Sequence, residues 1–321
     1  MPVGPFEPPW WLTNPHAQTL WPFLFQKPLA LKLTRERLEL PDGDFIDLCW
    51  TDRTSDVLII IFHGLEGSVH SHYARGILPV IDNHGWQAVF MHFRGCSGEH
   101  NRLPRSYHSG DTGDIKFLVD ILSRRHRDKR LFALGYSLGG NALLKFLGEA
   151  GDNAGISGAV AVSVPFDLAN GAMRLEQGLS RLYQRHLLNK LNTKLTSKFT
   201  HMESPVPMHG LAGLNTFRLF DDAITAPLHG FRDVDDYYTR SSSRRYLNHI
   251  RIPSLLIHAE DDPFMTPAAI PGKSELSSTV TLELSRHGGH VGFISGTNPL
   301  IPEYWLQERI PEFIKSVIGD S

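Results

Sequence analysis

A serine near the middle of the chain stands in a pattern typical of an enzyme nucleophile. Residues 135–139 read Gly-Tyr-Ser-Leu-Gly and match G-x-S-x-G, with Ser137 at the centre. The motif lies between an apolar run at 131–135 and a helical stretch at 138–149, and the sharp strand-to-helix turn that it favours makes such a serine project. Small residues at the flanking positions leave room where neighbouring chains approach. We therefore predict Ser137 as the nucleophile of an acyl-transfer reaction.

Two later loops carry the acid and the base that such a serine needs. The segment 260–263, Glu-Asp-Asp-Pro, follows the apolar run 253–259, and the segment 285–290, Ser-Arg-His-Gly-Gly-His, follows the run 280–284. Both loops come at the carboxyl ends of predicted parallel strands, where sites of open α/β sheets gather. The order Ser, then Asp, then His is the one expected for this type of nucleophile turn.

Each loop offers two candidates. We select Asp262 as the orienting acid because it stands deeper in its loop, directly before a proline, and Asp261 remains the alternative. We select His290 as the general base because two glycines precede it and let its loop approach the serine. His287 is the alternative and is expected to play a supporting part.

An oxyanion hole requires backbone N–H groups directed at the developing negative charge. The residue after the nucleophile, Leu138, is expected to supply one, at the amino end of a predicted helix. The loop 63–67, His-Gly-Leu-Glu-Gly, follows the apolar run 57–62 and is expected to supply the other. Leu65 is our candidate there, with Gly64 as the close alternative.

The elements around these loops predict an α/β fold with a mainly parallel central sheet flanked by helices, because buried strands alternate with helical stretches. Continuous apolar runs indicate strands buried on both faces at 57–62, 87–93, 131–135, 158–164, 253–259 and 280–284. Helical stretches are expected near 71–84, 111–126, 138–149 and 302–318. Two shorter runs, 37–40 and 45–50, flank a Pro-Asp-Gly-Asp turn and indicate an antiparallel hairpin at a sheet edge.

Three parts of the chain are distinguished by composition. Residues 1–30 are rich in Pro and Trp, which argues against a helix, so we expect an irregular arm packed on the core. Residues 31–166 and 251–321 form the predicted α/β core. Residues 167–250 contain amphipathic stretches without a convincing strand, and we expect a mainly helical cap inserted between core strands.

Taken together, five motifs and the amino-terminal arm resemble the YheT-like branch of the α/β-hydrolase superfamily. They are HGLEGS at 63–68, HFRGCSGE at 92–99, GYSLGGN at 135–141, AEDDPF at 259–264, GGHVGF at 288–293 and NPHAQTLWP at 14–22. The resemblance extends over nearly the whole chain and is weakest in the predicted cap. It implies the α/β-hydrolase fold and carboxylic-ester hydrolysis, with a charge-relay system at the positions of Ser137, Asp262 and His290.

Composition excludes several other classes. The net charge is −2 without long runs of one sign, which argues against a nucleic-acid partner. Cys49 and Cys96 are too few for a disulfide framework, and the first residues lack the pattern of a signal peptide, so we expect a cytoplasmic protein. No run approaches the length that spans a bilayer, although peripheral lipid contact stays open. We expect no cofactor and no metal, and the oligomeric state is left undetermined.

The predicted function is that of a serine carboxylesterase acting on short- to medium-chain acyl esters through an acyl-enzyme on Ser137. A cap rich in Leu, Phe and Met favours a small-molecule ester with an apolar acyl chain. An acyltransferase or a thioesterase would use the same residues, and product analysis alone separates them. A non-catalytic binding protein of the same fold is the remaining alternative.

Overall fold

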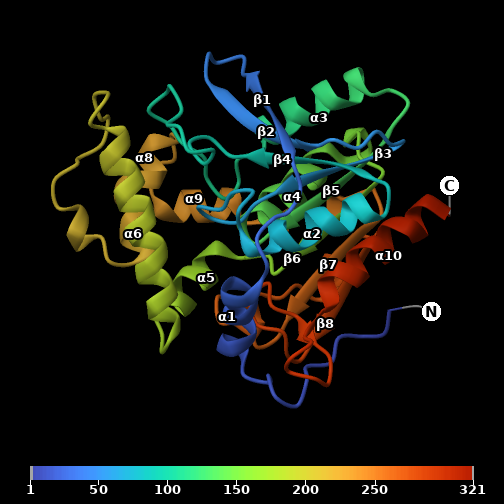
Figure 1. Cartoon of the computed structure of the whole chain (residues 1–321). Coiled ribbons are helices and arrows are strands. Elements are labelled where there is room, and N and C mark those ends of the chain that lie inside the picture. The colour runs from blue at the N-terminus through green and yellow to red at the C-terminus, as the bar shows by residue number, and fades with distance from the viewer. Residues whose placement is uncertain (1–2, 320–321) are drawn as a thin grey trace.

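A single mixed sheet forms the centre of the molecule (Figure 1). The computed structural model describes residues 3–319. Within them eight strands form one sheet in the order β1-β2-β4-β3-β5-β6-β7-β8. Strand β2 pairs antiparallel with both β1 and β4, and the pairs from β4 to β8 are parallel. The strands are β1 (Leu33–Glu39), β2 (Phe45–Thr51), β3 (Val57–Phe62), β4 (Gln87–His92), β5 (Arg130–Tyr136), β6 (Gly158–Val162), β7 (Ser254–Ala259) and β8 (Val280–Ser285). The predicted α/β class, parallel core and edge hairpin are confirmed. The run 280–284 does form a strand, but β8 lies at the edge of the sheet and only Val280 in it is buried, so the expected burial on both faces is wrong there.

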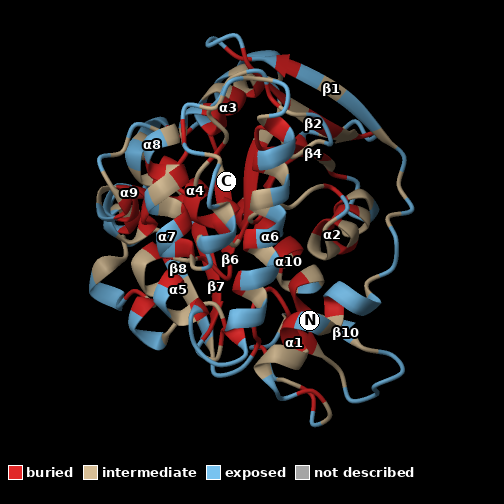
Figure 2. Ribbon diagram, turned by 90° about the vertical axis from the view of Figure 1, so that its left-hand side faces the viewer, coloured by how far each residue is buried: buried red, intermediate tan, exposed pale blue. Residues whose placement is uncertain are grey.

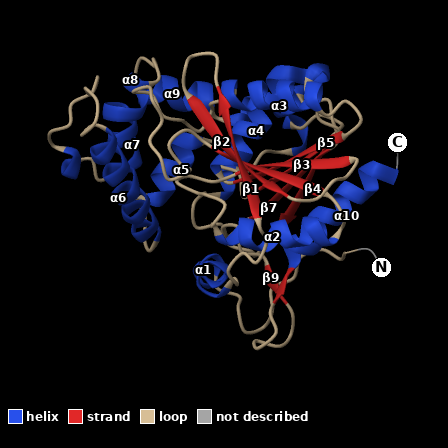
Figure 3. Cartoon of the chain, turned by 45° about the horizontal axis from the view of Figure 1, so that its top comes forward, coloured by secondary structure: helices blue, strands red, loops and turns tan. Residues whose placement is uncertain are grey.

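Helices cover both faces of the sheet. The helices α2 and α10 pack on one face of the sheet, and α3 and α4 pack on the other. Because both faces are covered, every residue of β3 is buried, and its side chains are apolar on both sides. Figures 1 and 3 show these two layers. The helices are α1 (Pro15–Phe25), α2 (His72–Asn83), α3 (Gly113–Arg125), α4 (Leu138–Ala150), α5 (Leu168–Leu175), α6 (Ser180–Lys198), α7 (Phe217–Phe220), α8 (Ala226–Leu228), α9 (Val234–Ser241) and α10 (Trp305–Gly319).

Short elements complete the chain. A small ladder pairs β9 (Ile294–Ser295) with β10 (Glu303–Tyr304), and a π-helical segment covers Asp221–Thr225. Turns of 3₁₀ helix cover Gly151–Asn153, Leu211–Gly213, Ser243–His249, Pro267–Ala269 and Lys273–Glu275. None of the helices in the part of the chain that the structure describes has the length and apolar character needed to cross a membrane.

The segment between β6 and β7 forms a helical insertion (residues 167–250) at one end of the sheet (Figure 3). It holds α5 to α9 and no strand. Its helices bury an apolar cluster of their own, made by Leu168, Ala172, Leu175, Leu188, Leu195, Val206, Phe217, Phe220, Ile224, Ala226, Val234, Tyr237 and Tyr238. Because this cluster is separate from the two beside the sheet, the insertion packs as a distinct layer over the carboxyl ends of the strands.

The prediction of a wholly irregular arm over residues 1–30 is wrong at 15–25, where the chain forms α1. Pro15 occupies the first turn, where its missing N–H would be unpaired in any helix. The Asn14 side chain caps the helix by accepting hydrogen bonds from the N–H groups of His16 and Ala17. The number of prolines alone therefore does not exclude a helix here, because one of them lies at the position where helices tolerate proline.

Candidate active site

Ser137 occupies the turn between β5 and α4 in a strained backbone conformation. Its φ is 51° and its ψ is −120°, a region that residues with a Cβ rarely adopt. Two glycines make the turn sterically feasible. A Cβ on Gly135 would lie 2.6 Å from Gly140 Cα, and one on Gly139 would lie 2.5 Å from the carbonyl oxygen of Phe62. The G-x-S-x-G pattern therefore reflects close approaches of backbone on both sides of the serine.

The three residues selected from the sequence form one hydrogen-bonded chain. His290 Nε2 lies 3.0 Å from Ser137 Oγ, and His290 Nδ1 lies 2.8 Å from Asp262 Oδ2. The other carboxylate oxygen of Asp262 accepts a 2.8 Å hydrogen bond from the backbone N–H of Phe264. With the Nδ1 proton on the carboxylate side, Nε2 is free to accept the serine proton. The arrangement can deprotonate a hydroxyl and stabilise the imidazolium that results.

These residues meet because their strands are neighbours in one parallel sheet. Ser137 follows β5, Asp262 follows β7 and His290 follows β8, so all three lie beyond carboxyl ends on the same edge. The loop after β6 contributes Ser163, whose Oγ accepts a 2.9 Å hydrogen bond from the Val291 N–H. The fold thus brings Ser137 together with His290, which lies 153 residues later in the sequence.

The helix α1 holds the loop that carries His290, which the sequence did not indicate. The backbone N–H of His290 donates a 2.9 Å hydrogen bond to Thr19 Oγ1. The buried amide of Gln18 bonds both the N–H of Ile294, at 2.8 Å, and its carbonyl oxygen, at 2.9 Å. The Asn-Pro pair at 14–15 is the local signal that could have predicted this helix.

The alternative acid and base, Asp261 and His287, form a second pair that is separate from the hydrogen bonds between Ser137, His290 and Asp262. Asp261 Oδ2 lies 3.2 Å from His287 Nδ1, and Asp261 Oδ1 accepts a 3.0 Å hydrogen bond from the Gly289 N–H. His287 is exposed, whereas Asp262 and His290 are buried. The Asp261 pair therefore shapes the turn before His290 and does not contact its ring.

The two backbone groups predicted for an oxyanion hole flank the serine. A Cβ on Gly64 would lie 3.2 Å from Ser137 Cβ, so the 63–67 loop borders Ser137. The Gly64 N–H donates a 2.9 Å hydrogen bond to the Tyr73 hydroxyl, which removes it from consideration. The N–H groups of Leu65 and Leu138 donate to no acceptor within residues 3–319, and Leu138 begins α4. Both remain available to a developing oxyanion.

Aromatic and neutral groups surround the imidazole of His290. The ring of Phe264 stacks on it, with 4.0 Å between centroids and 15° between planes. Burial lowers the pKa of His72 to about 3 and that of His258 to about 4. Both neighbouring histidines are therefore neutral near pH 7, so they add no positive charge against an imidazolium at His290.

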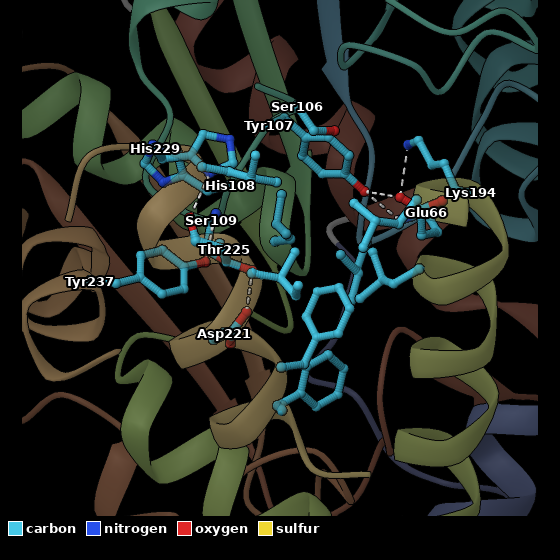
Figure 4. Close-up of a pocket in the computed structure, with 18 of the residues that line it drawn as sticks. Glu66, Ser106, Tyr107, His108, Ser109, Lys194, Asp221, Thr225, His229 and Tyr237 are labelled. Atoms are coloured by element: carbon cyan, nitrogen blue, oxygen red, sulfur yellow. Dashed lines mark hydrogen bonds and ion pairs between the residues drawn. The ribbon is translucent and has the colours of Figure 1, made fainter. Parts of the chain in front are cut away.

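A cavity of about 110 Å³ lies between the core and the helical insertion (Figure 4). Leu65 and Leu138 line it, so it reaches the turn of the nucleophile. Most of its wall is apolar and comes from the insertion: Leu191, Leu195, Phe217, Phe220, Ile224 and Leu228. Polar side chains lie on the remaining wall, among them Ser106, His108, Ser109, Asp221, Thr225 and His229. Such a mixture suits an apolar group with polar contacts at defined points.

An ion pair joins the insertion to the 63–67 loop, and no local sequence pattern indicates it. Lys194 Nζ of α6 lies 2.9 Å from Glu66 Oε1 and 3.0 Å from Cys96 Sγ. The Tyr107 hydroxyl donates to the same Glu66 oxygen and accepts from the Glu66 N–H, both at 2.8 Å. Figure 4 shows Lys194, Glu66 and Tyr107 together at one side of the cavity. No local pattern predicts a contact across 128 residues.

Metal-ligating side chains are not gathered anywhere in residues 3–319: no group of three or more His, Cys, Asp or Glu could hold an ion. The two cysteines, Cys49 and Cys96, are free thiols. Burial raises the pKa of both. Since the thiolate is the form that binds metals and attacks carbonyls, neither cysteine is poised for such chemistry at neutral pH.

Comparison with known proteins places this geometry in a family. The family described as the alpha/beta hydrolase fold matches residues 57–297. A relative from Escherichia coli, named "Putative esterase YheT", is 43% identical over 95% of this chain and 92% of its own. "Phospholipase ABHD3" of Mus musculus is 28% identical over 98% of this chain and 79% of its own. A solved structure of the Pyrococcus furiosus esterase Pf2001 superposes with a TM-score of 0.58 at 19% identity, covering 89% of this chain and 93% of that one. The chain therefore belongs to the α/β-hydrolase family, in its YheT-like branch.

Proposed function

We propose that this protein is a serine carboxylesterase that hydrolyses short- to medium-chain acyl esters through an acyl-enzyme on Ser137. The observation that carries the proposal is the hydrogen-bonded chain from Asp262 through His290 to Ser137. Membership of the α/β-hydrolase family supports it, as do relatives whose names include an esterase and a phospholipase. No cofactor is part of the proposal.

In the first half of the reaction, Ser137 Oγ attacks the ester carbonyl while His290 Nε2 takes the hydroxyl proton. The contact of 3.0 Å is within the reach of general base catalysis. Asp262 holds the imidazole in the required tautomer and stabilises its charged form. The N–H groups of Leu65 and Leu138 bind the oxyanion, and the dipole of α4 favours the negative charge there. His290 then protonates the leaving alcohol.

In the second half, water occupies the position that the alcohol has left. His290 takes a proton from this water, which attacks the acyl-enzyme carbonyl. The same two N–H groups bind the second oxyanion. Collapse of this intermediate returns the proton from His290 to Ser137 Oγ and releases the carboxylic acid.

The cavity supports an apolar acyl group as the part of the substrate that is recognised. Its wall beside Leu65 and Leu138 continues into leucine and phenylalanine side chains of the insertion. Burying such a chain contributes roughly 0.8 kcal/mol for each methylene group. Because Leu138 lines the cavity and directly follows Ser137, an acyl chain placed there would extend toward Ser137. We therefore propose that the length of this cavity limits the chain length of the preferred ester.

We further propose that residues 167–250 act as a cap on a core made of residues 31–166 and 251–321, with residues 1–30 as an arm. The separate apolar cluster of the insertion supports this division, and so does its share of the cavity wall. Residues 1–2 and 320–321 lie outside the described residues. The two free thiols support a reducing compartment, and we propose the cytoplasm as the location.

The test is hydrolysis of p-nitrophenyl esters from two-carbon to sixteen-carbon acyl chains by the wild type and by Ser137→Ala. We expect roughly a 10⁴-fold or greater loss of kcat/KM in the variant, with an unchanged melting temperature. Ser123→Ala, on α3 away from the site, is the matched control and should retain full activity. Full activity in Ser137→Ala would overturn the proposal.

The outcome with other acyl donors decides between the related activities. If esters react only slowly, the same two proteins should be assayed with acyl thioesters, since a thioesterase would use the same residues. If an added alcohol appears in the product as a new ester, the enzyme is an acyltransferase. In both cases, loss of the activity in Ser137→Ala would support Ser137 as the nucleophile and would change only the proposed acyl donor or acceptor.

A further inference from the structure

The helix α1 has two faces of opposite character. Gln18 and Thr19 are buried and hold the loop of His290. Leu20, Phe23 and Leu24 lie on the outer face and are 41%, 55% and 64% exposed. Their spacing of three and four residues places them in one stripe along the helix. An apolar stripe that faces water is unfavourable unless another surface covers it in use.

A second group of exposed apolar side chains lies beside this stripe. Leu179 and Leu182, at the start of α6, are 61% and 63% exposed. The two helices meet where His16 Nδ1 lies 3.2 Å from the Tyr183 hydroxyl, with the rings stacked at 5.7 Å. Figure 2 shows α1 and α6 on the same side of the molecule. We call Leu20, Phe23, Leu24, Leu179 and Leu182 together the apolar rim.

The surroundings of the apolar rim are strongly basic. Residues 168–198 contain six Lys or Arg and one Glu; Lys194 pairs with Glu66 and Lys198 is buried, which leaves four cations for this surface. Arg181, Arg185 and Lys190 are exposed on α6, and within the described residues none of them pairs with a carboxylate. The exposed Lys27 follows the stripe of α1. Exposed apolar side chains flanked by unpaired cations are the combination that binds anionic lipid surfaces.

A row of stacked rings connects the apolar rim with His290, the proposed general base. The ring of Tyr183 stacks on Phe264 at 5.0 Å, and Phe264 stacks on His290 at 4.0 Å. A surface that covers the rim would therefore lie close to the proposed active site, with the rings of Tyr183 and Phe264 between it and His290. We propose that the apolar rim and the basic side chains of α6 dock this protein on an anionic lipid bilayer. The docking itself does not depend on the proposed esterase activity.

A second copy of the chain fits this surface less well than a bilayer does. A symmetric dimer through the rim would bring the same patch of both copies together. Arg181, Arg185 and Lys190 of one copy would then face those of the other at short range, with Glu176 as the one carboxylate of residues 168–198 to balance them. Anionic headgroups complement the same cations, and the acyl region receives the apolar side chains.

The test is co-sedimentation of the Ser137→Ala variant with vesicles, so that binding is measured without hydrolysis of the lipid. We expect binding to vesicles made of equal parts of phosphatidylglycerol and phosphatidylcholine, and little binding to phosphatidylcholine alone. High salt should weaken the binding, because it screens the cations. Equal binding to both vesicle types, or to neither, would overturn the proposal whatever the outcome of the esterase assay.

Paired variants in the same background assign the binding to the rim. Phe23→Ser with Leu24→Ser should weaken binding by about tenfold or more, while Phe23→Leu with Leu24→Phe should preserve it. Arg181→Ser with Arg185→Ser should weaken it by roughly 30-fold, while the matched pair Arg124→Ser with Arg127→Ser should have no effect. Circular dichroism and melting temperature serve as the folding control.

Two results would refute the assignment. Loss of binding in the Arg124 and Arg127 pair would show that net charge alone drives the association. A rim variant that converts a dimer into a monomer in analytical ultracentrifugation, with vesicle binding unchanged, would identify a second copy as the occupant.

Discussion

The ring of Phe264 lies face to face with the imidazole of His290, 4.0 Å away and only 15° from parallel. The backbone N–H of the same residue donates to Asp262 Oδ1. One residue thus fixes both the acid, through its main chain, and the base, through its side chain. Substitution of the side chain leaves the main-chain hydrogen bond in place, so the two contributions can be separated.

Phe264→Leu is expected to lower kcat about tenfold with little change in KM, because an imidazole misplaced by even 1 Å loses much of its catalytic effect. Phe264→Tyr, which keeps a stacking ring, should retain most of the activity. Steady-state kinetics with a p-nitrophenyl ester provides the measurement. An unchanged kcat in Phe264→Leu would show that the stacking does not position His290.

Replacement of the two adjacent aspartates should have very different effects. Asp262→Asn is expected to lower kcat by about 10⁴-fold, since the imidazole loses the partner that fixes its tautomer. Asp261→Asn is the matched control and should cost far less, because Asp261 contacts Gly289 and His287 instead. The same ester assay measures both. A larger loss in Asp261→Asn would reverse the choice of acid.

The ion pair between Lys194 and Glu66 is expected to stabilise the 63–67 loop, because Glu66 directly follows Leu65, the proposed oxyanion donor. Lys194→Met and Glu66→Gln should each lower the free energy of unfolding by roughly 1–3 kcal/mol, since each leaves a partly buried charge without its partner. The double variant should lose less than the sum of the two. Thermal denaturation and kcat/KM over the full cycle measure the coupling, and strict additivity would contradict it.

Asp221 is expected to make the stability of the folded chain depend on pH. Its carboxylate accepts hydrogen bonds from Thr225 Oγ1, at 2.6 Å, and from the Tyr238 hydroxyl, at 2.9 Å. Burial nevertheless raises its pKa from 3.8 to about 6. Between these values the unfolded chain releases the proton and the folded chain retains it, so the free energy of unfolding falls as pH rises.

Asp221→Asn should remove this pH-dependent loss. The difference in melting temperature should move in favour of the variant from about pH 4 to about pH 6 and stay constant above. One pKa unit corresponds to about 1.4 kcal/mol, which limits the effect to about 3 kcal/mol. Denaturation curves for both proteins at each pH give the comparison. A difference that does not vary with pH would show that Asp221 is ionised like an exposed carboxyl group.

Most of the core could be read from the sequence, because its central strands are almost entirely buried and appear as apolar runs, whereas the edge strand β8 is mostly exposed or half-buried. The run 57–62 is one example, with every residue buried in the sheet. The helix α1 could not be read in this way. Its prolines argue against a helix when they are only counted, and the Asn-Pro pair at 14–15 is a helix start signal that acts through position: Asn14 caps the helix and Pro15 fits its first turn.

The type of fold, and the order in which Ser137, Asp262 and His290 follow their strands, can be read from the amino-acid sequence alone, since each of these residues follows an apolar run in a short local pattern. Parallel strands in one sheet then oblige their carboxyl ends to share an edge. Three contacts are known only from the folded chain: Asp262 and not Asp261 bonds His290, Gly64 bonds Tyr73, and α1 holds the loop of His290. Those contacts depend on the packing of side chains from distant segments. Local periodicity carries no information about such packing.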